Sequence, residues 1–214
     1  MSKKVSKDEA LKAVKNISDK NSESSLQAEA MEAVKTLILW AGDNPEREGL
    51  LDTPKRVVKA YKQFFSGYND DPEEILSRTF EEVDGYDDAV IVRDIRLESH
   101  CEHHMVPIIG VAHVGYIPSN RVVGISKLAR LVDLYSKRLQ TQETMTAQIA
   151  NTIDKVLKPK GVAVVIDSNH NCMSTRGVHK ANSSTITSRM LGIFRTDEKA
   201  REEFISLINS PKKF

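Results

Sequence analysis

The chain of 214 residues is 40% hydrophobic and 29% charged, and its formal net charge at pH 7 is +1. This length suggests one or two domains, and it suffices for a core that folds without the help of a disulfide or a metal. The near-neutral charge argues against broad nucleic-acid binding, which usually requires a basic excess.

The first 25 residues are rich in Lys, Ser, Asp and Glu, and we expect a tail or a frayed helix there. They contain no apolar signal core, and no stretch of the chain approaches the roughly 18 apolar residues of a membrane span. The whole chain has only two cysteines, which is not a disulfide framework. We therefore predict a reduced, cytoplasmic protein with no membrane or nucleic-acid partner.

Helices are expected in the next segment, residues 26–85. The spacing of apolar residues predicts a helix over Leu26–Trp40. In DTPKR, Thr53 is the expected N-cap of a second helix and Pro54 its first helical residue. A short acidic helix is expected after Pro72.

From Ala89 onward the sequence becomes rich in β-branched residues, which favour strands. We predict strands over 89–99, 108–118, 122–125, 162–172 and 184–194, and helices over 126–139, 141–157 and 197–208. This order lacks the strict βαβ alternation of a parallel sheet, so an α+β class with a largely antiparallel sheet is predicted for 86–214. We expect it to form a single domain with 26–85.

A cluster of metal-binding residue types lies in SHCEHHMVP, at Ser99–Pro107. Cys101 and His104 offer a C-x-x-H pair, but outside this segment the chain has no second C-x-x-C or H-x-x-H pair to close a structural site. The other cysteine is Cys172, within NHNC. Two thiolates and one imidazole leave the fourth position of zinc open for water, which is typical of a catalytic site.

Strand alternation bears on both halves of this cluster. If 162–172 stays a regular strand, His170 and Cys172 share one face, which would place His170 for proton transfer beside the metal. A regular first strand would instead pair Cys101 with His103, so the choice of His104 requires a turn before Pro107. The alternative is that the cysteines are buried apolar side chains and the histidines ordinary polar groups.

Candidate anion-binding residues occur in GISKLAR. Ser126 is a natural N-cap, and Lys127 and Arg130 lie three positions apart on the first helical turn. Cations oppose the helix dipole there, so an anion bound at the N-terminus would explain them. Arg176 and Arg56 are further candidates. The alternative is a solvated basic surface, and neither a Walker A motif nor G-x-G-x-x-G occurs.

Gln142 and Glu143 begin the next predicted helix. An acidic residue suits a helix N-terminus for electrostatic reasons alone. The functional alternative is that the Glu143 carboxylate accepts N–H groups from a guanine-like ring.

Several motifs, in this order, resemble the GTP cyclohydrolase I family: DTPKR, CEHHMVP, GYIP, GISKLAR, QTQE, NHNCMSTRG and TSRMLGIFR. The resemblance covers about Leu26 to Leu207. It implies the tunnelling fold, an antiparallel four-stranded sheet with two helices, preceded by N-terminal helices. It also implies a homodecamer of two pentamers, with active sites at subunit interfaces. The implied reaction converts GTP and water to formate and 7,8-dihydroneopterin triphosphate, the first step toward tetrahydrofolate and related pterins.

The resemblance also implies a role for each candidate residue. One Zn²⁺ per subunit would be held by Cys101, His104 and Cys172. His170 would give a proton to guanine N7, and His103 and Ser126 would assist later proton movements. Guanine would be bound by Glu143 with Gln142, and the triphosphate by Lys127, Arg130, Arg176 and Arg56.

Two other functions remain open at this point. Related tunnelling-fold enzymes act on other pterin or deazapurine substrates, some of them with a cysteine nucleophile. A zinc-stabilised nucleotide-binding module without turnover would belong to a different class altogether.

Overall fold

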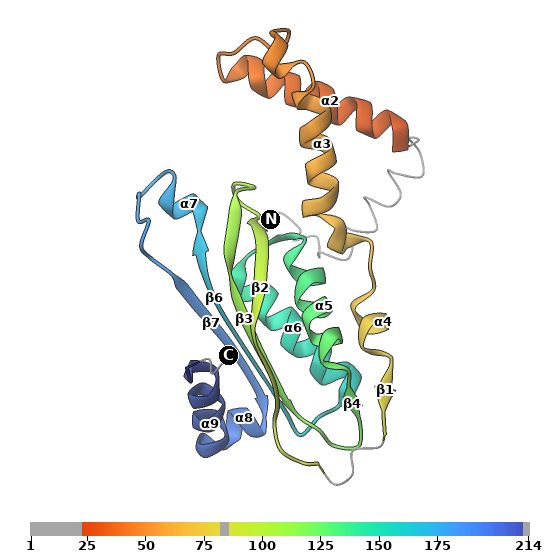
Figure 1. Cartoon of the computed structure of the whole chain (residues 1–214), viewed down its shortest axis with the longest axis vertical. Helices are drawn as coiled ribbons and strands as arrows, with labels where there is room; N and C mark the ends of the chain where they lie inside the picture. The colour runs from red at the N-terminus through yellow and green to blue at the C-terminus, as the bar shows by residue number, and fades with distance from the viewer. Residues whose placement is uncertain (1–22, 82–85, 212–214) are drawn as a thin grey trace, which may run out of the picture. The chain divides into compact units, whose positions relative to one another are not determined.

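The computed structural model describes residues 23–81 and 86–211 (Figure 1). Most of the predicted N-terminal tail, residues 1–22, lies outside the described residues. The chain divides into two compact units between Gln63 and Phe64. This boundary falls inside the segment 26–85, and the expectation that 26–85 and 86–214 form one domain stays a prediction.

The first unit contains helix α2 (Glu23–Trp40), the 3-10 helix η1 (Glu48–Leu50) and most of α3 (Thr53–Phe64). Helix α3 starts one residue earlier than expected, because the carbonyl of Asp52 already accepts the helical hydrogen bond from the Arg56 N–H (3.0 Å). Thr53 is therefore the first helical residue rather than the cap. Pro54 tolerates the second position equally well, since its missing N–H has no partner in the first turn.

The second unit holds the sheets and the remaining helices. In chain order they are η2 (Ser66–Tyr68), α4 (Pro72–Leu76), β1 (Thr79–Phe80), β2 (Val90–Cys101), β3 (Pro107–Ile117), β4 (Val122–Val123), α5 (Ile125–Ser136), β5 (Leu139–Gln140), α6 (Gln142–Leu157), β6 (Gly161–His170), α7 (Asn171–Ser174), β7 (Thr185–Gly192), α8 (Ile193–Thr196) and α9 (Glu198–Asn209). In the part of the chain that the structure describes, no helix is both long and apolar enough to cross a bilayer.

The main sheet has the strand order β5-β2-β3-β6-β7. Its four long strands are antiparallel, in agreement with the mixed α and β class, whereas β5 runs parallel to β2. This fifth strand was not expected: Leu139 and Gln140, between two helices, pair with His100 and Cys101. The predicted short strand at 122–125 is present as β4, but it pairs with β1 in a separate sheet.

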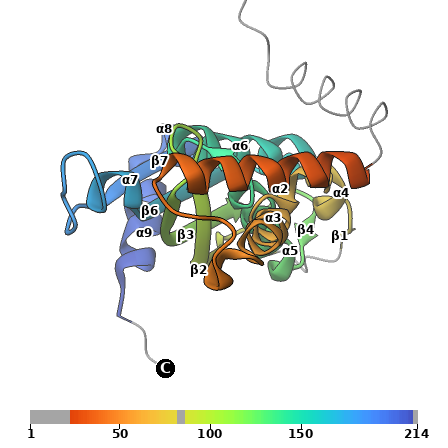
Figure 2. The same ribbon diagram turned by 90° about the horizontal axis from the view of Figure 1, so that it is seen from above.

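Helices cover the two faces of the main sheet differently (Figures 1 and 2). One face packs against α5 and α6 through alternating strand residues such as Val162, Val164 and Ile166. The residues between them, Ala163 and Val165, pack on the other face with apolar side chains of α8 and α9. The period-2 alternation of β6 thus serves two cores, which explains why this strand reads as a continuous apolar run.

Candidate metal centre

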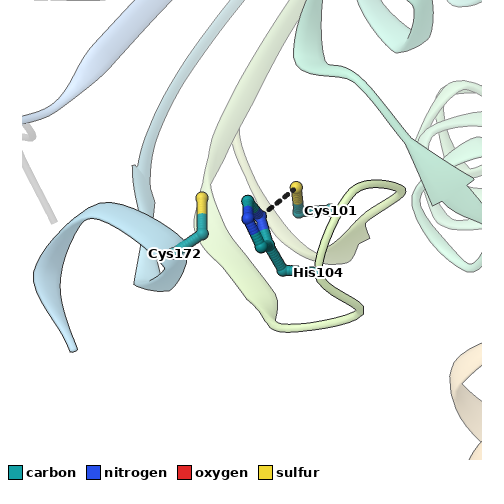
Figure 3. A group of neighbouring side chains, drawn as sticks. All are labelled: Cys101, His104 and Cys172. Carbon is teal, nitrogen blue, oxygen red and sulfur yellow. Dashed lines mark hydrogen bonds between the residues drawn. The ribbon is translucent and has the colours of Figure 1, made fainter. Parts of the chain in front are cut away.

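Three potential metal ligands converge at one end of the main sheet (Figure 3). The ligand atoms of Cys101, His104 and Cys172 all lie within 4.8 Å of one another. Cys101 is buried, Cys172 is half-buried and His104 is exposed. The group therefore has one side closed by protein and one side open to an incoming molecule.

The turn after β2 brings Cys101 and His104 together. Strand β2 ends at Cys101, whose carbonyl accepts from the Met105 N–H (2.8 Å) and whose N–H donates to Val106 (2.9 Å). Met105 adopts a left-handed φ of 55°, which reverses the chain before Pro107. His104 Nδ1 then lies 3.8 Å from Cys101 Sγ. The turn expected before Pro107 is confirmed.

Cys172 reaches the same place by a route that strand alternation did not predict. Strand β6 ends at His170, and Cys172 lies in the helical turn α7. The regular strand expected up to Cys172 is therefore wrong, because the chain turns as soon as its pairing with β3 ends at Ile108–His170. His100 likewise pairs with Pro107 at the start of β3, so β2 and β6 end at the same end of the sheet, on either side of β3.

The donor set fits a zinc ion. Tetrahedral zinc with bonds of about 2.3 Å to sulfur and about 2.0 Å to nitrogen requires ligand atoms about 3.5–3.8 Å apart. Burial raises the pKa of the Cys172 thiol, and the neighbouring Cys101 raises it further. A cation between the two sulfurs would offset both effects, because it favours the thiolate form that binds metal.

Two further predicted residues lie next to this group. His103 Nδ1 lies 3.6 Å from Cys101 Sγ, and the His103 ring is exposed. Arg176 Nη1 donates to His104 Nε2 at 3.0 Å. His103 and Arg176 are thus both present at the open side of the group.

His100, the residue before Cys101, has a packing environment instead. It is 7% exposed and stacks on Phe64, with ring centroids 4.6 Å apart, and it meets the edge of Phe65. Burial lowers the pKa of His100.

His170 and the start of α6 flank the metal group. Helix α6 begins at Gln142, with Thr141 as the N-cap, so the predicted helix start is confirmed. Gln142 is 1% exposed, and its Oε1 lies 2.7 Å from His170 Nε2. Burial lowers the pKa of His170, and the carboxylate of exposed Glu143 partly opposes this effect.

Sequence reasoning missed one member of this network, Ser168. Its hydroxyl donates to Gln142 Oε1 at 2.7 Å, and the side chain is 2% exposed. The sequence feature that could have identified Ser168 is its position two residues before His170, which places both residues on the same face of β6.

The predicted anion-binding residues of α5 are not brought to the metal group. Lys127 and Arg130 lie in the first half of α5, while its far end leads into β5, where Gln140 pairs with Cys101. At about 1.5 Å of rise per residue, most of the helix length separates the two ends (Figure 1). Ser126 lies near the same distant end as Lys127.

The sequence predicted Ser126 as the N-cap of α5, and this prediction is wrong. Gly124 holds that position, and its carbonyl accepts from the Lys127 N–H at 2.8 Å. The first turn is thus bonded before Ser126 can cap it, and the Ser126 side chain is left exposed.

Lys127 and Arg130 line a cleft of about 600 Å³ in the second unit. Acidic and basic side chains share its walls: Asp70, Asp71, Glu74, Asp133, Arg78, Lys127, Arg130 and Lys137. The remaining candidate, Arg56, lies in the first unit with an exposed side chain, 3.3 Å from Asp52.

Comparison with known proteins identifies relatives over most of the chain. The family model for GTP cyclohydrolase I matches residues 30–209. A protein of Maricaulis maris named GTP cyclohydrolase 1 is 61% identical over 180 residues, covering 84% of this chain and 88% of the relative. One of the same name from Brucella anthropi is 58% identical over 181 residues, covering 85% of each chain.

Among solved structures, an archaeosine synthase QueF-Like in the apo form aligns with a TM-score of 0.41 and 20% identity. The alignment covers 49% of this chain and 93% of the other. A score of this size does not assign a fold.

Proposed function

The chain belongs to the GTP cyclohydrolase I family, and we propose that it converts GTP and water to formate and 7,8-dihydroneopterin triphosphate at a zinc site formed by Cys101, His104 and Cys172. The convergence of these three ligand atoms carries the assignment of the site. The product is the precursor of tetrahydrofolate and related pterins.

The proposed metal is zinc because two thiolates and one imidazole are the ligands it prefers, with a fourth position left for water. Zinc bound there would supply a water activated for attack at neutral pH, since it would lower the pKa of that water far below the value in bulk solvent, to about 7.

The proposed roles of the side chains follow from what the reaction demands. Release of guanine C8 as formate breaks both of its bonds to ring nitrogens, and a proton given to N7 by His170 makes C8 more electrophilic. His103 lies at the open side of the group, where it is available for later proton movements. Glu143, exposed beside His170, is proposed to accept the N–H groups of guanine. Such a contact rejects adenine, which lacks the matching donors.

We further propose that a complete site combines two subunits of a homo-oligomer. The metal group, His170 and Glu143 lie at one end of the sheet, whereas Ser126, Lys127 and Arg130 lie toward the other end of α5. A triphosphate needs several cations around it. A neighbouring copy would bring its α5 residues to this chain's metal group, and a decamer of two pentamers is the proposed assembly.

The direct test is formate release from GTP by the zinc-loaded full-length protein. We expect formate and the pterin triphosphate in a 1:1 ratio, measured by formate dehydrogenase coupling and by fluorescence after oxidation. ATP is the control substrate, and it should yield neither product. Tight GTP binding without formate would contradict the proposal and support a non-catalytic nucleotide-binding module.

A further inference from the structure

The side-chain amide of Gln142 connects helix α6, on which it lies, with strands β6 and β7. Its Nε2 donates to the carbonyls of Ile166 on β6 (3.0 Å) and Thr185 on β7 (2.8 Å). Its Oε1 lies 2.7 Å from both Ser168 Oγ and His170 Nε2. At 1% exposure, the side chain has all its hydrogen-bonding capacity used by protein groups.

These contacts determine which way the amide points. Carbonyl oxygens only accept hydrogen bonds, so the atom facing Ile166 and Thr185 must be the NH₂ group. The opposite orientation would place an oxygen against two oxygens and leave buried acceptors unpaired, which is unfavourable in a protein interior. The atom facing His170 is therefore the amide oxygen.

An amide oxygen facing a ring nitrogen requires a proton on that nitrogen. His170 Nε2 must accordingly carry a hydrogen to donate to Gln142, whether the ring is neutral or cationic. The other ring nitrogen, Nδ1, is then the atom left to exchange a proton with a reactant. Histidines in catalytic sites are commonly oriented in this way by a neighbouring group.

We propose that Gln142 is a positioning residue that holds His170 in the Nε2-protonated form and leaves proton transfer to Nδ1, rather than a residue that contacts guanine. The inference deepens the proposed function and rests on it for the role of His170 in the reaction. It explains why Gln142 precedes Glu143: the buried residue orients the histidine and the exposed residue faces the substrate.

The first test is the tautomer of His170 in the zinc-loaded full-length protein. Solid-state NMR of ¹⁵N-histidine-labelled protein, with a His170→Asn sample to assign the signals, separates protonated from unprotonated ring nitrogens. We expect a protonated Nε2 and, in the neutral ring, an unprotonated Nδ1. A neutral ring with its proton on Nδ1 would overturn the proposal without any variant of Gln142 having to fold.

The second test uses Gln142→Met, which keeps the length of the side chain but removes both polar atoms. We expect mixed tautomers of His170 and a fall in kcat of about 10–100-fold, as for other orienting partners. KM for GTP should change by less than about threefold, because a buried side chain does not reach the substrate. A large rise in KM with an unchanged tautomer would show direct contact with guanine.

Ser168→Ala is the matched control, because it removes the other donor to Gln142 Oε1 and leaves the bond to His170. It should keep the wild-type tautomer, and loss of that tautomer would contradict the assigned role of Gln142. Zinc content and the unfolding midpoint of each variant show that it is folded. If the tautomer is as expected but no formate is released from GTP, the proposed function fails and the orientation of His170 stands.

Discussion

At the scale of single residues, the chemistry depends on which atoms are already engaged by the protein. The side-chain amide of Gln142 has no atom left for a ligand, whereas the side chain of Glu143 beside it is exposed. Burial and the neighbouring Cys101 both disfavour ionisation of the Cys172 thiol, and a bound cation would offset that penalty. The Cys172 thiol would thus become a thiolate more readily with a metal bound beside it than without one.

Replacement of one sulfur ligand tests this dependence. We expect Cys172→Ser to lose zinc and formate release together, with at least a 100-fold fall in activity, because zinc favours thiolate over a neutral hydroxyl. The measurement is the zinc-to-protein ratio after dialysis. Ser174→Ala, in the same helical turn, is the control and should keep both. A Cys172→Ser variant with full zinc would remove Cys172 from the ligand set.

At the scale of elements, the site depends on how closely β3 and β6 approach each other. Gly110 on β3 lies opposite Ser168 on β6, and a Cβ at Gly110 would collide with the Asp167 carbonyl and the Ser168 side chain. Because β6 leads directly into His170 and Cys172, the spacing between these strands sets the position of both residues.

Gly110→Ala should therefore disturb the site without changing any ligand. We expect a loss of about 1–3 kcal/mol in the free energy of unfolding, as for other overpacked interiors, together with weaker zinc binding. Urea unfolding and chelator competition measure the two effects. Gly124→Ala is the control, since its Cβ would have nothing within 4 Å and its φ of −58° suits alanine. Equal behaviour of the two variants would show that the strand spacing does not matter.

Sequence reasoning succeeded where local chemistry decides the structure. The turn that selects His104 was predictable from Pro107, and the start of α6 from its polar residues. The helical turn at Cys172 was not, because it depends on where β3 stops pairing with β6. The orientation of Gln142 was equally hidden, since its partners on β6 and β7 are distant in sequence.

At the scale of the whole molecule, the candidate residues fall into separate groups. One group surrounds the metal ligands, another occupies the first half of α5, and Arg56 belongs to the first unit. The separation of the α5 group from the metal ligands follows from the topology, because β3 carries the chain away from the metal end of the sheet before α5 begins. No local sequence signal reports such a separation.

Mixing two inactive variants tests the proposed sharing of sites between subunits. Chains with Lys127→Ala and Arg130→Ala keep the metal group, while Cys172→Ser chains keep the α5 cations. Co-expression should restore activity in about a quarter of the sites if each site takes one group from each of two neighbours and subunits mix at random. Formate release from purified mixed oligomers is the measurement. Activity no higher than that of the separate variants would indicate that each chain builds its own site.

The convergence of Cys101 and Cys172 also has a consequence for folding kinetics. The two residues are 71 positions apart. A metal held between them acts as a cross-link over a long loop, and chain-entropy estimates assign about 4 kcal/mol to a closure of this length. Pairing of β2, β3 and β6 brings the full ligand set together, so we expect metal capture to be a late event that locks a nearly finished sheet. A chelator that removes the ion would then act mainly by accelerating unfolding, with little effect on the rate at which the chain first folds.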